Sequence, residues 1–239
     1  ETSDRDGKVI AADGLEETEN WLKEHQGLVG LHASFTLGDD TLGRAVDLMH
    51  KTNSGIHIHV AEDMYDQEQS VSAHGKRVVE RLSDAGVLGS PKSILVHCLH
   101  LDDRERELIR NSPAWVAENC ESNLNNRVGH FNGAGLGDNI MLGTDGMHSD
   151  MLQSLKAAFF SGQQHDNISY DSAYRRFRNV HPYLRANGFR GDGDNNLVIL
   201  DYESPTPVTK ENFIGHLLFG ISSRHVTHVI SGGRLIVRE

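Results

Sequence analysis

A repeating β/α pattern constrains the fold of this sequence more than any other feature. From Leu28 onward, a short apolar run ends in a polar residue and is followed by a loop and an amphipathic helical stretch. This order predicts parallel strands joined by helices. We expect strands at residues 28–35, 55–61, 93–99, 114–118 and 139–143. None shows the strict alternation of a half-exposed strand, so we expect both faces of the sheet to be covered.

The segments between and around these strands predict helices. Leu42, Ala45, Val46 and Met49 recur at helical spacing after the first strand. Asp40-Thr41 and Asp102-Asp103 suit helix starts, because aspartate favours the N-cap. The first dozen residues are turn-like. We also expect helices at residues 15–26, 151–160 and 170–188.

The C-terminal segment has a different pattern. Residues 196–202 and 226–237 have strand composition, and Ser231-Gly232-Gly233 predicts a hairpin turn within the second run. We therefore divide the chain into an α/β domain at residues 1–195 and a C-terminal β segment at 196–239. Five parallel strands fit an open doubly wound sheet or part of an eight-stranded barrel. A glycine-rich phosphate-binding loop would favour the open sheet, and the sequence contains none.

Composition excludes several classes of function. The formal net charge is −11, from 23 basic and 34 acidic residues, which argues against nucleic-acid and anionic-membrane partners. The two cysteines, Cys98 and Cys120, lie in apolar or strand-like stretches and suggest neither a disulfide nor a cysteine zinc site. No apolar run approaches the roughly 20 residues of a membrane helix. We expect a soluble, cytoplasmic protein.

The sharpest chemical pattern is GIHIHVAE at residues 55–62. Strand alternation points His57 and His59 to the same side, and Glu62 follows the strand. Active sites of β/α barrels form at the carboxyl ends of strands, so this spacing could place a metal ligand next to a general base. The alternative is a pair of interior histidines held by hydrogen bonds.

Two further strand ends carry candidate residues. His97 and His100 end the run at residues 93–100, where a second acid–base group could face the same pocket. A structural role is equally consistent for His97 and is favoured for His100. Asp145 ends the run at 139–143 among small residues and suits a metal or reacting centre, with a helix cap as the alternative. No nucleophile elbow, Walker loop or P-C-x-x-C motif occurs.

These motifs together resemble the amidohydrolase superfamily, in the branch of guanine, S-adenosylhomocysteine and triazine aminohydrolases. The similar segments are GLHASFT at 30–36, HIHVAE at 57–62, VHCLHL at 96–101, SNLNN at 122–126 and LGTDG at 142–146. Within that branch the sequence, including DYESPTP at 201–207, most resembles the SsnA-type aminohydrolases. The resemblance implies a TIM-like (β/α)8 metallo-barrel with a small C-terminal β-sandwich.

The resemblance also implies the roles of individual residues. His59 and Asp145 correspond to metal ligands, Glu62 to the proton shuttle and His97 to the group that stabilises developing charge. Asp145 doubles as the base, and His32 corresponds to a substrate-contacting histidine. The implied cofactor is one divalent ion, zinc or else iron, which makes hydroxide available at neutral pH.

The sequence also departs from the family pattern. No first-strand His-x-His pair precedes His32, and only five of the eight barrel strands are recognisable. Two of the four expected metal ligands are therefore present, and we expect the sequence to be part of a longer chain. ENCES at 118–122 replaces the more usual lead into Ser-Asn.

The leading hypothesis is a deaminase that releases ammonia from a heterocyclic, purine-like substrate and forms a homodimer. One alternative is an amide or chloro-hydrolase that uses the same metal and water. The other is a catalytically silent relative that serves as a binding subunit, which the lack of His-x-His would explain.

Overall fold

The computed structural model describes residues 1–191 and 193–238 of the chain. It divides them into two compact units. Unit 1 comprises Glu1–Glu118 and Asn123–Ile140, and unit 2 comprises Asn119–Ser122 and Met141–Glu239. The domain boundary at residue 195 stays a prediction.

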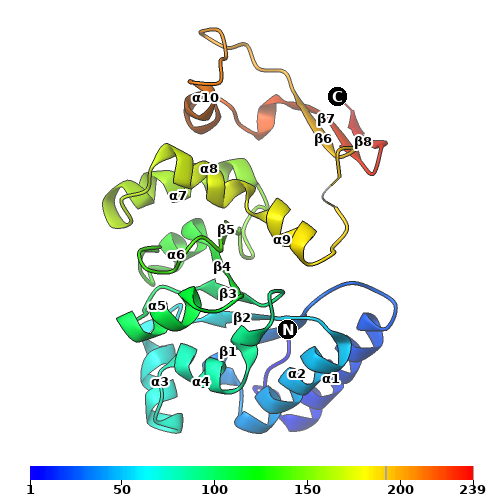
Figure 1. The fold of residues 1–239 in the computed structure, drawn as a ribbon, viewed down its shortest axis with the longest axis vertical. Coiled ribbons are helices and arrows are strands. Elements are labelled where there is room, and N and C mark those ends of the chain that lie inside the picture. The colour runs from blue at the N-terminus through cyan, green and yellow to red at the C-terminus, as the bar shows by residue number, and fades with distance from the viewer. Residues whose placement is uncertain (192, 239) are drawn as a thin grey trace. The chain divides into compact units, whose positions relative to one another are not determined.

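A five-stranded sheet has the order β1-β2-β3-β4-β5 (Figure 1). Its strands are β1 (Val29–Ala33), β2 (Ile56–Val60), β3 (Ile94–His97), β4 (Trp115–Glu118) and β5 (Ile140–Leu142). The pairs from β1 to β4 are parallel, as the β/α pattern predicts. Each predicted strand is present and is shorter than its apolar run, so the polar residues that follow the runs lie in loops at the strand ends.

The helices of unit 1 follow the strands in alternation. They are α1 (Lys8–Leu22), α2 (Asp39–Thr52), α3 (Met64–His74), α4 (Val78–Asp84) and α5 (Asp103–Arg110), with short 3-10 turns at Ser34–Thr36 and Val87–Gly89. Asp102 caps α5 as predicted and accepts the Glu105 N–H at 2.9 Å. α2 begins one residue before the predicted Asp40-Thr41 start.

The prediction for the N-terminal residues was wrong. α1 begins at Lys8, not at residue 15, and it ends at Leu22. Thr2 forms a parallel bridge with Leu31 of β1, which ties the segment before α1 to the sheet. Ala11 and Leu15, four residues apart, are both buried on the inner face of α1. Tertiary packing thus extends the helix through a segment whose local sequence resembles a turn.

The core of unit 1 lies on one face of the sheet. Val29, Leu31, Ile56 and Ile58 are completely buried, and each stabilises the fold by about 1.5–3 kcal/mol relative to exposure. The expectation that both faces are covered holds for β4, in which all four residues are buried. In β1 and β2, however, alternate residues are only half-buried. This second face carries His32, His57 and His59.

Unit 2 combines helices with a small antiparallel sheet. Its helices are α7 (Met151–His165), α8 (Tyr170–Arg178), α9 (Val180–Ala186) and α10 (Phe213–Phe219), with a 3-10 turn at Ser223–His225. β6 (Leu197–Leu200), β7 (Val226–Ser231) and β8 (Arg234–Arg238) form the sheet in that order. The predicted hairpin turn is confirmed: Gly232 and Gly233 adopt φ values of 56° and 79°, which favour glycine.

Residues 170–188 form two helices rather than the single predicted one. The break falls at Asn179, and α9 contains Pro182 in its first turn. Proline has no N–H to donate to the carbonyl four residues earlier, so a continuous helix would lose that bond. α6 (Cys120–Asn126), which crosses the boundary between the units, and α10 were not predicted.

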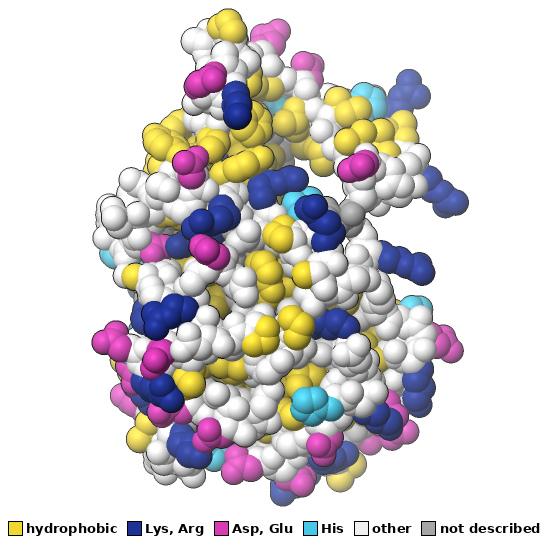
Figure 2. Space-filling model, viewed as in Figure 1, with side chains coloured by type: hydrophobic (Ala, Val, Ile, Leu, Met, Phe, Trp, Pro, Cys, Tyr) yellow, Lys and Arg dark blue, Asp and Glu magenta, His cyan; other side chains and the backbone are white. Residues whose placement is uncertain are grey.

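The surface of unit 2 is partly apolar. Figure 2 shows hydrophobic side chains gathered over α7 and α8. Phe160 and Tyr170, from these helices, are each at least half exposed. Among the residues that the structure describes, no helix has the length and apolarity needed to cross a membrane.

Candidate active site

The candidate site in unit 1 forms where β2 and β3 end. The parallel register pairs Val60 with His97, so the carboxyl ends of these strands lie at one edge of the sheet. The chain turns sharply after each strand, with positive φ at Ala61 (47°), His97 (71°) and Cys98 (55°). Such conformations cost of order 1–3 kcal/mol each in non-glycine residues. Strain is therefore concentrated next to the predicted site residues.

His59, Glu62 and His97 come together at this edge. His59 Nδ1 lies 3.0 Å from His97 Nε2, and Glu62 Oε2 lies 3.5 Å from the same nitrogen. The two imidazole rings stack with centroids 5.1 Å apart. The side chain of His97 is fully buried, whereas those of His59 and Glu62 are 16% and 29% exposed.

These three side chains fit a divalent metal ion. One ligand atom from each lies within 4.8 Å of the others, and no second group of this kind occurs among the described residues. Two imidazole nitrogens and a carboxylate oxygen are a donor set that zinc accepts. The structure thus brings together three of the predicted site residues. Which of them bind a metal stays a prediction.

Asn123 of α6 contacts the ring nitrogen of His97 that does not face His59 and Glu62. This nitrogen, His97 Nδ1, lies 2.7 Å from Asn123 Oδ1, and both side chains are buried. Asn126, on the same helix, donates to Glu62 Oε1 at 3.3 Å. The SNLNN motif therefore contacts the site through two of its asparagines, a relation that motif spacing alone does not reveal.

His32 and His57 lie beside His59. The His32 ring is 5.6 Å from that of His59, and His57 is edge-on to it at 6.3 Å. His57 and His59 thus share a face, as strand alternation predicts. His32 Nδ1 also lies 3.2 Å from Thr36 Oγ1. Burial, followed by the positive charges of Arg5 and His59, lowers the pKa of His32, so its neutral form is favoured.

His100 points to a different partner. Its Nε2 lies 2.7 Å from the Val128 carbonyl oxygen, at a distance that fits N–H donation to this oxygen. This contact agrees with the structural role that the sequence favours for His100.

Asp145 belongs to unit 2, where it follows β5 with φ at 52°. Ser122 Oγ donates to Asp145 Oδ2 at 2.6 Å, and the Gly146 N–H donates to Oδ1 at 2.8 Å. The alternative role as a helix cap is wrong, because Asp150 caps α7. Its carboxylate is thus held by short local bonds, and its role as ligand and base stays a prediction.

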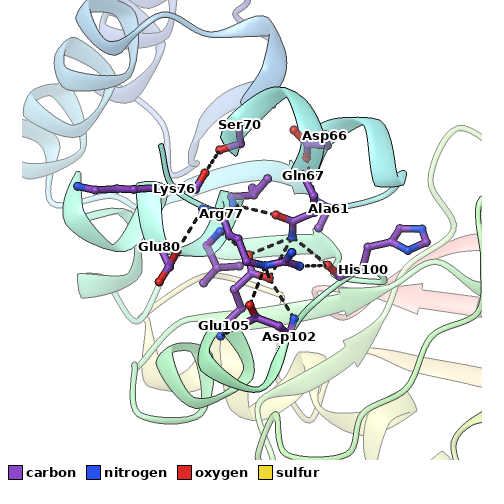
Figure 3. Close-up of polar contacts among 12 residues, drawn as sticks. Ala61, Asp66, Gln67, Ser70, Lys76, Arg77, Glu80, His100, Asp102 and Glu105 are labelled. Carbon is purple, nitrogen blue, oxygen red and sulfur yellow. Dashed lines mark hydrogen bonds and ion pairs between the residues drawn. The ribbon is translucent and has the colours of Figure 1, made fainter. Parts of the chain in front are cut away.

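A buried polar network supports the loop after β3, and the sequence reasoning missed it. Gln67 of α3 and Arg77, just before α4, both donate to the His100 carbonyl oxygen, at 2.9 and 2.7 Å. Figure 3 shows that they converge with Glu105 of α5, whose carboxylate accepts from both. This network fixes the strand-end loop three residues beyond His97. Its members lie far apart in sequence, so no local pattern signals it.

Asp66 was also missed, and it joins two strand-end loops. It accepts the Ala61 N–H at 2.8 Å and the Phe35 N–H at 3.2 Å, and its side chain is buried. Burial raises the pKa of this carboxyl to about 6, although the two backbone bonds oppose the shift. A possible sequence signal was an aspartate in the first turn of the helix that follows β2.

Comparisons with known proteins identify the family of the chain. The amidohydrolase family model matches residues 11–176. A 5-methylthioadenosine/S-adenosylhomocysteine deaminase of Desulforamulus reducens is 28% identical, covering 98% of this chain and 58% of the relative. A 5'-deoxyadenosine deaminase of Methanothermobacter thermautotrophicus is 30% identical, covering 94% of this chain and 58% of the relative. The chain spans less than two thirds of these curated relatives.

Solved structures show the same fold. An adenosine deaminase from Xanthomonas campestris with bound zinc superposes with a TM-score of 0.82 at 20% identity, covering 97% of this chain and 57% of that one. Guanine deaminase from E. coli gives a TM-score of 0.81 at 17% identity, covering all of this chain and 63% of that one. At these identities the likeness concerns the fold.

Proposed function

Because the chain belongs to the amidohydrolase family, we propose that it is the larger part of a metal-dependent aminohydrolase. Its substrate is a heterocycle with an exocyclic amino group, which leaves as ammonia. The observation that carries this proposal is the cluster of His59, Glu62 and His97 at the ends of two parallel strands. The family resemblance inferred from the motifs is confirmed by the family match.

The relatives support a purine-like substrate. Those compared above are named as deaminases of 5-methylthioadenosine, S-adenosylhomocysteine and 5'-deoxyadenosine. All three names describe an adenine attached to a modified ribose, so we propose an adenine nucleoside as the substrate. We further propose a TIM-like (β/α)8 barrel for the complete domain, a homodimer and a cytoplasmic location.

His59 and Asp145 are the proposed metal ligands, the latter from the family motif alone. A bound zinc or iron ion would supply hydroxide at neutral pH. Glu62, partly exposed and close to His97, would protonate the ring nitrogen, take up the hydroxyl proton of the tetrahedral intermediate and pass it to the leaving amine. The proton that Asp145 takes from water would then restore the protonated Glu62. His97 stabilises the negative charge that develops on the attacking oxygen. Asp145 accepts the proton released at the start, and His32 contacts the substrate.

The test is ammonia release from a panel of adenine nucleosides, guanine and triazines by the zinc-supplemented protein. We expect ammonia from at least one adenine nucleoside and a fall of about 100-fold or more in rate for Glu62→Gln, the range for loss of a general acid–base group. Glu68→Gln is the matched control, because Glu68 is exposed on α3.

Product analysis separates the proposal from its alternatives. Chloride or a carboxylate product without ammonia would indicate the other hydrolase chemistries. A metal-loaded protein that is inert towards the whole panel would support a binding subunit and contradict the proposal.

A further inference from the structure

We infer that Asn123 is a positioning residue that keeps the proton of neutral His97 on Nδ1, so that the Nε2 lone pair faces His59 and Glu62. The inference rests on the proposed function in one respect, that His97 is a site residue. It adds a residue whose action on the site is indirect and which can be tested without turnover.

The contact between His97 and Asn123 is short and buried from solvent. His97 Nδ1 lies 2.7 Å from Asn123 Oδ1, and the two residues are 0% and 1% exposed. Water therefore cannot compete for either atom, and the hydrogen bond is stronger than it would be at the surface.

The chemistry of the amide assigns the proton. A carbonyl oxygen only accepts, so His97 Nδ1 must donate and therefore carries the hydrogen. A neutral imidazole has one N–H, which leaves Nε2 with a lone pair. This nitrogen is the one that lies 3.0 Å from His59 Nδ1 and 3.5 Å from Glu62 Oε2. The opposite amide orientation would place Nδ2 at the ring and the proton on Nε2, so the two orientations predict opposite tautomers.

The lone pair on Nε2 is what the site requires. A free lone pair lets Nε2 take up a proton, and the imidazolium so formed can stabilise the negative charge that the proposed function places beside His97. The other ring N–H of a metal-site histidine is commonly held by an oxygen acceptor. Asn123 provides such an acceptor without charge. A carboxylate at this position would instead favour the positively charged imidazolium.

An amide at position 123 costs folding free energy, because one of its polar atoms is buried without a partner among the described residues. Its Nδ2 is buried and has no hydrogen-bond partner within the described parts of the chain. An unsatisfied buried donor costs about 1–3 kcal/mol. A side chain selected for packing alone would avoid this cost, so the contact of Oδ1 with His97 is the reason for an amide here.

The turn that carries His97 does not depend on Asn123 for its place in the fold. The Cys98 N–H donates to the Val60 carbonyl oxygen at 2.9 Å, and the Leu99 N–H donates to that of Ala61 at 3.2 Å. These backbone bonds hold the turn after β3 against β2. Substitution of Asn123 is therefore expected to change the proton on His97 while leaving the turn intact.

The experiment is ring-nitrogen NMR of the histidine-labelled, metal-free protein near pH 8, with the His97 signals assigned by comparison with His97→Gln. Two-bond nitrogen–proton correlations distinguish the two neutral tautomers. We expect the neutral Nδ1–H form for the wild type. Asn123→Asp keeps an acceptor, so Nδ1 should stay protonated there, with a larger share of the imidazolium form. In Asn123→Leu, of similar volume, the Nε2–H form should become the main species. Asn125→Leu, an exposed position on the same helix, should leave His97 unchanged.

Nε2–H in the wild type, or Nδ1–H retained in Asn123→Leu, would overturn the inference. If Asn123→Leu does not fold, the protonation of His97 Nδ1 in the wild-type and Asn123→Asp spectra still tests the inference.

The two proposals fail in different ways. Nε2–H in a wild-type protein that releases ammonia rejects the role of Asn123 and leaves the function intact. Nδ1–H in a protein that binds zinc but releases no ammonia rejects the function and leaves the tautomer assignment intact.

Discussion

Replacement of Glu105 by glutamine should strongly destabilise unit 1. The carboxylate is completely buried and accepts from Gln67 Nε2 at 3.0 Å, Arg77 Nε at 2.7 Å, and the backbone N–H groups of Val79 at 3.0 Å and Asp102 at 3.1 Å. Glutamine keeps one oxygen and turns the other into a donor. At least one backbone N–H must then face an NH2 group, with no water nearby to replace the lost acceptor.

The size of the effect follows from these contacts. A buried donor left without an acceptor costs about 1–3 kcal/mol. The weakened bond to Arg77 adds about 1–2 kcal/mol, at the low end for a charged group, because Arg77 is 28% exposed and keeps an ion pair with Asp102 at 2.9 Å. The sum, about 2–5 kcal/mol, is a large part of the 5–15 kcal/mol that stabilises a typical domain.

Urea unfolding followed by tryptophan fluorescence measures this loss directly. Both tryptophans, Trp21 and Trp115, lie in unit 1, so the signal reports on that unit. Glu107→Gln is the matched control on α5: its ion pair with Arg104 is exposed and should contribute about 0–1 kcal/mol. A free energy of unfolding for Glu105→Gln within 1 kcal/mol of the wild type would refute the reasoning.

Two further predictions concern Asp66 and Ser122. Burial raises the pKa of Asp66 from 3.8 to about 6, so the folded state binds this proton more tightly than the unfolded state and the group's stabilising contribution is lost as pH rises between these values. Relative to Asp66→Asn, the wild type should lose about 3 kcal/mol of unfolding free energy between pH 3.8 and pH 7, and a constant difference in urea titrations would contradict this. Ser122→Ala removes the 2.6 Å bond to Asp145 Oδ2, so kcat/KM should fall about 10-fold while the melting temperature changes little. Unchanged kcat/KM would show that this bond does not position the carboxylate.

The sequence predicted what depends on local pattern. The apolar runs located all five strands of the sheet, because a buried strand needs a short continuous run of apolar residues. The spacing of His59 and Glu62 likewise placed both residues at one strand end. The early start of α1 escaped prediction because packing of Ala11 and Leu15 decides it.

What escaped prediction depends on long-range contacts. Gln67 and Glu105 are 38 residues apart, and His97 and Asn123 are 26 apart. Asn123 was visible as part of a motif, but its partner was not. Polar residues at strand ends could be read from sequence, whereas the buried groups that hold them in place required the fold.

Metal dependence of ammonia release tests the central claim most directly. The purified protein would be stripped with a chelator, zinc would be added back in steps, and bound metal and the rate of ammonia release from an adenine nucleoside would be measured on the same samples. The proposed function predicts negligible release without metal and a rate that rises in proportion to bound zinc up to about one ion per chain. Full ammonia release from the stripped protein, or stoichiometric zinc without release, would contradict it.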